Sequence, residues 1–167
     1  MHRILIIAAP RNFRDEELFE PLHLFGEAGY ETVIASTQTG PIRGSEGGWA
    51  SAGILIAQAK VKDYSAIVFV GGFGALSLHS DLAAQSLAKK AFDAGLIVAA
   101  ICVAPVILAK AGLLKDKSAT CFETEAEKLR ALGADYTGES VEVAGRIVTG
   151  NGPLAATEFA RAVISLI

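Results

Sequence analysis

The sequence of 167 residues has little of what builds disulfide-linked, metal-binding or nucleic-acid-binding proteins. It contains two cysteines and three histidines, with no Cys-x-x-Cys spacing and no histidine pair. Neither a disulfide framework nor a metal site is therefore predicted, and two reduced thiols fit a cytoplasmic protein. Lysine and arginine form no run, and the formal net charge is −3. The electrostatic footprint of a nucleic-acid-binding protein is thus missing.

Long apolar runs are missing as well. The longest uncharged stretch, 95–109, is interrupted by Pro105, and it is shorter than the roughly 18 residues of a membrane span. Near the start, Arg11 and Arg14 follow the apolar run 4–10, which leaves no room for a signal-peptide core and its cleavage site. We therefore expect a cytoplasmic protein that does not enter a membrane.

The sequence is rich in apolar residues, at 51%, against 20% charged residues, so it can bury a substantial core in one domain spanning 1–167. Apolar or β-branched runs predict strands at 3–8, 30–36, 66–70, 96–101, 119–121, 141–143 and 147–148. Helical spacing predicts helices at 15–28, 80–94, 104–111, 123–132 and from 154 onward. The glycine-rich stretch 40–53 indicates turns or a small hairpin. The alternation predicts an α/β fold, a doubly wound and mostly parallel sheet with helices on both faces.

Cys102 lies where a buried strand must turn sharply into a helix, between Ile101 and the small residue Ala104. This pattern is typical of a nucleophile elbow, in which the side chain projects from the sheet and nearby amides can form an oxyanion hole. The start of the following helix would favour a thiolate. A buried structural cysteine is the alternative, because a lone cysteine on an apolar strand usually has that role.

Two further segments follow predicted strands and carry polar or flexible groups. Gly71 and Gly72 would let the backbone approach another group closely. A dinucleotide fingerprint fits this segment poorly, because Ser77 occupies the third glycine position. Acids cluster at 15–17, where helix capping explains Asp15 and Glu16. Glu17 is the candidate partner of Cys102, with a pKa raised enough to keep its proton.

Several motifs together resemble the DJ-1/ThiJ/PfpI superfamily over essentially the whole chain. They are Phe13-Arg14-Asp15-Glu16-Glu17-Leu18 with Pro21, Gly71-Gly72, Ala100-Ile101-Cys102, Ala111-Gly112-Leu113-Leu114, Ala119-Thr120-Cys121-Phe122, and Thr149-Gly150-Asn151-Gly152-Pro153 with Glu158-Phe159-Ala160.

The resemblance implies a flavodoxin-like α/β sandwich that is usually a homodimer. No cofactor is expected, because a thiolate adds to small carbonyl compounds without one. Cys102 takes the place of the nucleophile and Glu17 that of the protonated glutamate. The backbone N–H groups of Gly72 and Val103 would face the cysteine.

Three of the positions at which the sequence departs from parts of the superfamily are candidate site residues. Val103 stands where PfpI-type members typically carry a histidine directly after the cysteine. Cys121 stands near the place from which a histidine approaches the cysteine in the human member. Arg14 stands where PfpI-type members often carry an acid, and it could bind an anionic substrate group, stabilise the thiolate or simply be solvated. Cys121 and Arg14 are therefore accessory candidates, and His23 is expected on the surface.

Three hypotheses about function follow. The first is a cysteine-dependent enzyme acting on small aldehydes or 2-oxoaldehydes, of the glyoxalase III or deglycase type, with Glu17 as acid and base. The second is a redox sensor or stress-protective, chaperone-like protein, in which Cys102 is oxidised. The third is an intracellular peptidase, which would need a histidine from elsewhere, such as a neighbouring subunit. A disulfide between Cys102 and Cys121 is less expected than two separate thiols.

Overall fold

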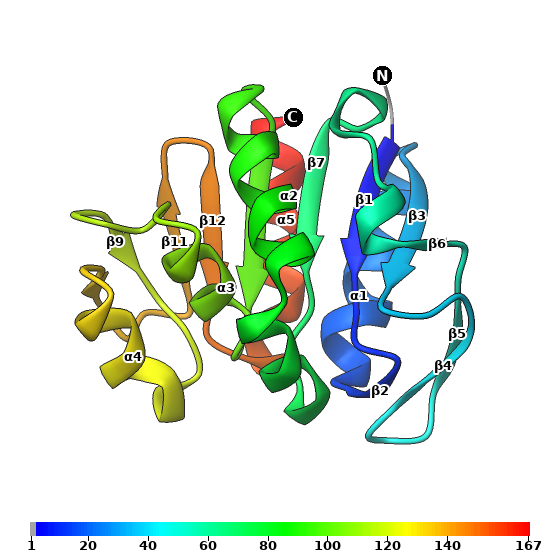
Figure 1. Cartoon of the computed structure of the whole chain (residues 1–167), viewed down its shortest axis with the longest axis horizontal. Helices are drawn as coiled ribbons and strands as arrows, with labels where there is room; N and C mark the ends of the chain where they lie inside the picture. Colours follow the sequence, from blue (N-terminus) through cyan, green and yellow to red (C-terminus); the bar gives the residue numbers. More distant parts are fainter. Residues whose placement is uncertain (1–2) are drawn as a thin grey trace.

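A seven-stranded sheet runs through the middle of the protein, and the computed structural model describes it within residues 3–167 (Figure 1). In spatial order the strands are β11 (Val141–Ala144), β12 (Ile147–Gly150), β8 (Ile97–Ile101), β7 (Ala66–Phe69), β1 (Arg3–Ile7), β3 (Glu31–Ser36) and β6 (Ile54–Leu55). All neighbours pair in parallel except β11 and β12, which form an antiparallel hairpin. The predicted doubly wound, flavodoxin-like sheet is confirmed.

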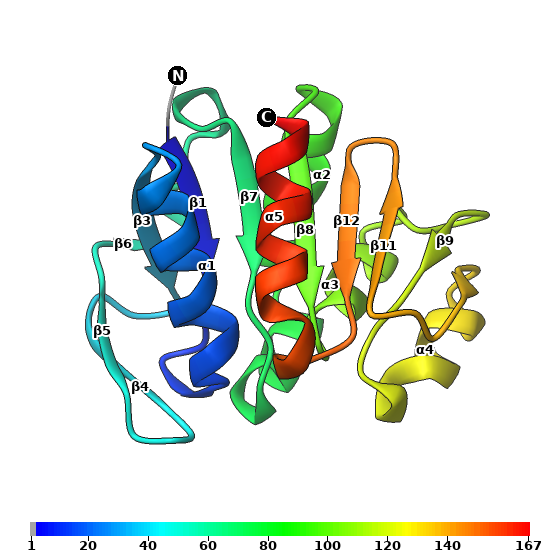
Figure 2. The ribbon, with the colours of Figure 1, turned by 180° about the vertical axis from the view of Figure 1, so that it is seen from behind.

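Helices cover both faces of this sheet, which explains why its central strands are continuous apolar runs. On one face lie α2 (Leu82–Asp93) and α3 (Pro105–Lys110), in front of the sheet in Figure 1. On the other lie α1 (Asp15–Glu27) and α5 (Ala156–Leu166), in front in Figure 2. Every residue of β7 and β8 is buried.

Smaller elements surround the main sheet. A three-stranded sheet contains β2 (Arg11–Phe13), β4 (Gly40–Gly44) and β5 (Trp49–Ala52), and a two-stranded one contains β9 (Ser118–Ala119) and β10 (Asp135–Tyr136). Beyond β11 lies the short helix α4 (Ala126–Ala131). Turns of 3₁₀ helix are η1 (Ile56–Gln58), η2 (Val61–Asp63), η3 (Phe73–Ser80), η4 (Glu123–Glu125) and η5 (Pro153–Ala155). The hairpin expected within 40–53 is the pair β4–β5.

Two expected elements differ in detail. The strand expected at 119–121 ends at Ala119, and the backbone N–H of Phe122 donates to the carbonyl of Cys102 at 2.8 Å. This hydrogen bond draws the chain away from the β9 ladder. The helix expected at 123–132 begins with the 3₁₀ turn η4 and becomes α-helical only from Ala126.

The carboxyl ends of β1, β7, β8 and β12 meet at one edge of the sheet, the lower edge in Figure 1. The register aligns Phe69 with Ala100 and Ile101 with Gly150. Residues that directly follow these strands are therefore neighbours in space, and the candidate site lies there, as expected for an open α/β sheet.

Candidate active site

Cys102 occupies a sharp turn immediately after β8. Its backbone has φ of +66°, in the left-handed region that residues other than glycine rarely adopt. Such a conformation costs on the order of 1–3 kcal/mol. Two hydrogen bonds hold it, since the N–H of Cys102 donates to the Gly150 carbonyl at 2.9 Å and its own carbonyl accepts from Phe122. The elbow inferred from the sequence is therefore present, with the Cys102 residue 6% exposed.

Glu17 lies on the first turn of α1 and is fully buried. Its Oε2 accepts a hydrogen bond from the backbone N–H of Gly71 at 2.9 Å. Its Oε1 is buried without a nitrogen or oxygen partner among residues 3–167, and the Cys102 thiol is a neighbour that perturbs its ionisation. Burial raises the pKa of Glu17 to about 7, against the opposing effects of Cys102, Gly71 and the Arg14 charge. The expectation of a raised pKa at this position is met.

Gly71 is the residue that allows Glu17 and Cys102 to meet. A Cβ atom on Gly71 would lie 2.5 Å from the Cys102 Cβ and 2.7 Å from Glu17 Oε2. Real Cβ atoms essentially never approach other heavy atoms this closely. The absence of a side chain on Gly71 therefore leaves room for the Glu17 carboxyl and the Cys102 side chain to lie next to each other.

The pKa of Cys102 differs from the sequence-based expectation. Burial, followed by the charge of Glu17, raises it to about 12, although N–H groups of Gly72 and Val103 act in the opposite direction. The following helix α3 has only six residues, so its dipole does not outweigh burial. Repulsion from Glu17 exists only while that carboxyl is ionised, and the two groups titrate as a coupled pair. A thiolate here accordingly requires a protonated Glu17.

Gly72 and Val103 place their backbone N–H groups beside the sulfur of Cys102, as their hydrogen-bonding effects on its pKa indicate. Gly72 has φ of +97°, and a Cβ there would collide with the backbone of Asn12 and Arg14. The N–H of Arg14 in turn donates to the Gly71 carbonyl at 3.1 Å. The loop before α1 and the loop after β7 are therefore packed backbone to backbone around the thiol.

The two accessory candidates, Arg14 and Cys121, are perturbed by acidic side chains. The Arg14 guanidinium pairs with Glu16 at 2.7 Å and with Glu46 at 3.2 Å, so its charge is balanced at the rim, although it still lowers the pKa of Glu17. Cys121 is a fully buried free thiol. Burial and then the charge of Glu125 raise its pKa to about 12.

His79 is a residue near the site that sequence reasoning did not place there. It is buried at the end of η3, and its Nε2 donates to the Val103 carbonyl at 2.8 Å. The carbonyl can only accept, so this nitrogen carries the proton. Burial lowers the pKa of His79 and favours the neutral ring. Its only sequence signal was a lone histidine in the apolar stretch 75–79. His23, as expected, is exposed on α1.

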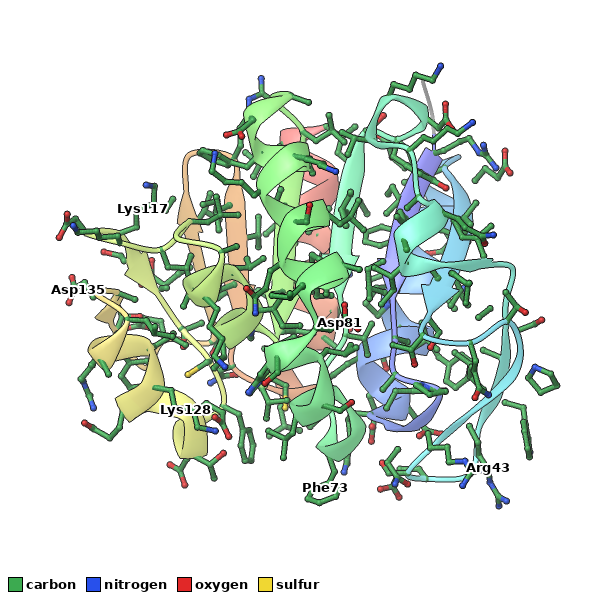
Figure 3. The ribbon with its side chains drawn as sticks, viewed as in Figure 1. Arg43, Phe73, Asp81, Lys117, Lys128 and Asp135 are labelled. Carbon is green, nitrogen blue, oxygen red and sulfur yellow. The ribbon has the colours of Figure 1, made fainter. Side chains whose placement is uncertain are left out.

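A cavity of about 430 Å³ lies next to the elbow, on the side of the Phe122 backbone. Its apolar wall includes Phe122, Tyr136 and Leu154, and its polar lining includes Ser140 and Asn151. Phe73, which is 76% exposed, projects from the same lower edge of the molecule (Figure 3). Within residues 3–167 there is no cluster of three or more His, Cys, Asp or Glu side chains suited to a metal ion. The helices described there include none that could cross a bilayer.

A cysteine on a strand-to-helix elbow, facing a buried glutamate at the carboxyl edge of a doubly wound sheet, defines a class of α/β proteins with a cysteine–glutamate pair. Comparison with known proteins identifies the family within it. The model of the DJ-1/PfpI family matches residues 2–166. The chain belongs to the DJ-1/PfpI family.

Individual relatives agree with this assignment. A deglycase of Thermococcus kodakarensis is 32% identical over 151 residues, which cover 90% of each chain. A glutathione-independent glyoxalase of Caenorhabditis elegans is 25% identical over 160 residues, covering 96% of this chain and 86% of the relative. The crystal structure of a ThiJ/PfpI domain protein from Brachyspira murdochii has a TM-score of 0.98 at 37% identity, covering 99% of this chain and 96% of the other.

Proposed function

We propose that the protein is a cofactor-independent, cysteine-dependent enzyme that acts on small aldehydes or 2-oxoaldehydes, in the manner of a glyoxalase III or a deglycase. Cys102 is the nucleophile and Glu17 the acid and base. One observation carries the proposal: a buried carboxyl with a pKa of about 7 lies beside a cysteine on an elbow. A pKa near the working pH is what one group needs to accept and donate a proton in turn. The deglycase and glyoxalase relatives support the substrate class.

The first step is addition of sulfur to the aldehyde. The Glu17 carboxylate takes the Cys102 proton, and the sulfur forms a bond to the aldehyde carbon. The carbonyl oxygen gains the displaced electron pair, and the N–H groups of Gly72 and Val103 are placed to stabilise it. Protonated Glu17 then returns the proton to that oxygen, which gives a hemithioacetal on Cys102.

A 2-oxoaldehyde can continue without an external oxidant. Glu17 removes the proton from the carbon bound to sulfur, the electron pair moves to the oxygen of the neighbouring ketone, and protonated Glu17 gives its proton to that oxygen, which forms an enediol. Glu17 then takes the proton from the hydroxyl on the carbon bound to sulfur and delivers it to the former ketone carbon. This leaves a thioester of a 2-hydroxy acid, which water hydrolyses to release Cys102. One carbon is oxidised and its neighbour reduced, so methylglyoxal and water give lactate and the electrons balance.

Lactate formation from methylglyoxal tests this proposal. Cys102→Ser should abolish turnover, and Glu17→Gln should lower kcat by about 10²–10⁴-fold. In the wild type the rate should rise as the pH passes about 7, because Glu17 becomes a base there. Cys121→Ser is the matched control and should retain activity. Turnover that survives in Cys102→Ser would contradict the proposal.

Oxidation of Cys102 is the second candidate function. The N–H groups of Gly72 and Val103 would also stabilise a sulfinate, whereas the raised pKa of the thiol slows its reaction with peroxide. Mass spectrometry after mild peroxide treatment tests whether Cys102 is a redox sensor. Two added oxygens on Cys102 and none on Cys121 favour a sensor, and equal oxidation of both contradicts it.

A peptidase is the least supported candidate. His79 contacts the carbonyl of Val103 and not the sulfur of Cys102, so it does not take the place of the histidine that Val103 replaces. A histidine from a partner subunit would be required. The homodimer remains a proposal, which sedimentation of the intact chain tests.

A further inference from the structure

A second cavity, of about 420 Å³, lies on the three-stranded sheet, away from the cysteine–glutamate pair. Its lining consists of Pro10, Arg11, Gln38, Pro41, Arg43 and Trp49. Arg43 marks its place at the lower right of the molecule in Figure 3. The lining includes two arginines and no acid, although the chain as a whole has a net charge of −3. The local charge is therefore opposite to that of the molecule.

The two arginines are held side by side by the backbone. Arg11 and Arg43 are register partners in the parallel pair β2–β4, and the N–H of Arg43 donates to the Pro10 carbonyl at 3.0 Å. Like charges at opposed positions on neighbouring strands destabilise a sheet. Within residues 3–167 no acidic side chain lies within ion-pair distance of either arginine, whereas Arg14 has two such partners. A bound anion would relieve this repulsion.

Trp49 adds a flat aromatic surface to the same cavity. It is the register partner of Arg43 in the β4–β5 hairpin, and its ring centroid lies 5.3 Å from the Arg43 guanidinium. This cation–π contact keeps Arg43 oriented over the ring. Trp49 is nevertheless 60% exposed, so much of its surface is free to stack on a ligand.

We propose that this cavity binds an organic phosphate that carries a flat ring, in the chemical class of a nucleoside monophosphate. Two guanidinium groups match the charge of a phosphate dianion better than that of a single carboxylate, and arginine binds phosphate oxygens in a bidentate manner. The ring stacks on Trp49, and Gln38 offers an amide to its polar edge. The volume lies within the range of about 300–1,000 Å³ usual for small-molecule sites.

Trp49 is the only tryptophan of the chain, so its fluorescence reports on this cavity alone. We expect AMP to change the fluorescence of the intact wild-type protein along a saturable curve. Inorganic phosphate, which lacks the ring, and adenosine, which lacks the charge, should each bind at least tenfold more weakly. Equal affinities for AMP and inorganic phosphate would show that the ring takes no part and would overturn the proposal.

Charge-removing variants locate the binding site. The double variant Arg11→Gln, Arg43→Gln retains Trp49 and should weaken AMP binding by about tenfold or more, as the loss of hydrogen bonds to a charged group predicts. Arg161→Gln removes a charge from an exposed position on α5 and is the matched control. Calorimetry with Trp49→Ala should show a similar loss. AMP curves that coincide for the wild type and the double variant would overturn the proposal.

The variant Cys102→Ser tests whether this site is separate from the active site. Because the cavity does not include Cys102 or Glu17, AMP should bind this variant as tightly as the wild type. Loss of AMP binding in Cys102→Ser would place the ligand at the elbow and would contradict the assignment.

Discussion

The hydrogen bond from His79 to Val103 shows how a residue can act on the site without touching substrate. Val103 supplies an N–H group to the Cys102 sulfur, and its carbonyl accepts from His79 at 2.8 Å. The histidine is buried beneath the elbow, so it restrains the orientation of the residue that follows the nucleophile. We therefore regard His79 as a positioning residue.

Removing the hydrogen-bond donor of His79 should slow Cys102 chemistry. In His79→Leu the buried Val103 carbonyl loses its partner, which costs about 1–3 kcal/mol of unfolding free energy. We expect a slower reaction of Cys102 with iodoacetamide and a changed pH profile of that reaction. His79→Gln can place an N–H near the same point and should restore both. The measurement is the rate of Cys102 alkylation against pH, followed by mass spectrometry.

Ser77→Ala is the control for this prediction. It deletes an exposed hydrogen bond to the Gly74 carbonyl within the same 3₁₀ turn and leaves the His79 contact intact. Its alkylation profile should match that of the wild type. If His79→Leu and Ser77→Ala gave the same profile, His79 would have no positioning role.

At the scale of the element, one carboxylate of α1 attaches the β4–β5 hairpin to that helix. Asp15 Oδ1 accepts from the Glu46 N–H at 3.0 Å, and Oδ2 accepts from the Gly48 N–H at 2.7 Å. A Cβ on Gly48 would lie 2.5 Å from Oδ2, so the turn needs glycine there to approach the helix. The hairpin carries Arg43 and Trp49, and its tip supplies Glu46 to Arg14. Asp15 thus joins the hairpin that lines the second cavity to the helix that carries Glu17.

Asp15→Ala should loosen the hairpin while the main sheet stays folded. Two hydrogen bonds to a charged acceptor are lost, each worth about 1.5–3 kcal/mol when well formed. We expect much faster hydrogen exchange at the amides of Glu46 and Gly48 and a lower Tm. Asp81→Ala is the control, since it removes the cap hydrogen bond to Ala84 of α2, costing about 1 kcal/mol. Unchanged exchange at Glu46 and Gly48 in Asp15→Ala would contradict this role.

The elements that the sequence predicted well are those with strong periodicity. The apolar run that became β8 and the charged amphipathic stretch that became α1 lie within a residue or two of their expected bounds. The strand β2 and the short 3₁₀ segments have no such periodicity. No pattern in the sequence indicated β2, and some of the 3₁₀ segments, such as η4, were included in predicted helices. The segment η3, which positions His79, begins at a glycine-rich turn, and its course depends on Gly74 packing against the Arg11 carbonyl.

At the scale of the whole molecule, the cysteine–glutamate pair and the second cavity each combine residues that lie far apart in the sequence. Glu17 and Cys102 could be paired from the sequence because both follow strands that end at one sheet edge and both match family motifs. Arg11 and Arg43 could not be paired, because strands of three and five residues gave no register. The pKa of Cys102 was also beyond the sequence, since it depends on the degree of burial.

The raised pKa of Glu17 links the site to the stability of the whole protein. In the unfolded chain this carboxyl titrates near 4.5, and in the folded protein near 7. Between these values the folded state retains a proton that the unfolded state has lost. The free energy of unfolding therefore falls as the pH rises through this window, by about 3 kcal/mol in total. Below pH 4.5 this loss is absent, and above pH 7 it is complete.

Glu17→Gln should remove this pH-dependent loss of stability. The amide stays neutral and its oxygen can still accept from the Gly71 N–H, so the variant should match the wild type near pH 4 and exceed it near pH 8. The expected gain, up to about 3 kcal/mol, is measured by urea unfolding at both pH values. Glu158→Gln, on the exposed side of α5, should give no such gain. If Glu17→Gln were no more stable than the wild type at pH 8, the pKa of Glu17 would not be raised in the folded protein, and Glu17 would lose its place as the acid that serves Cys102.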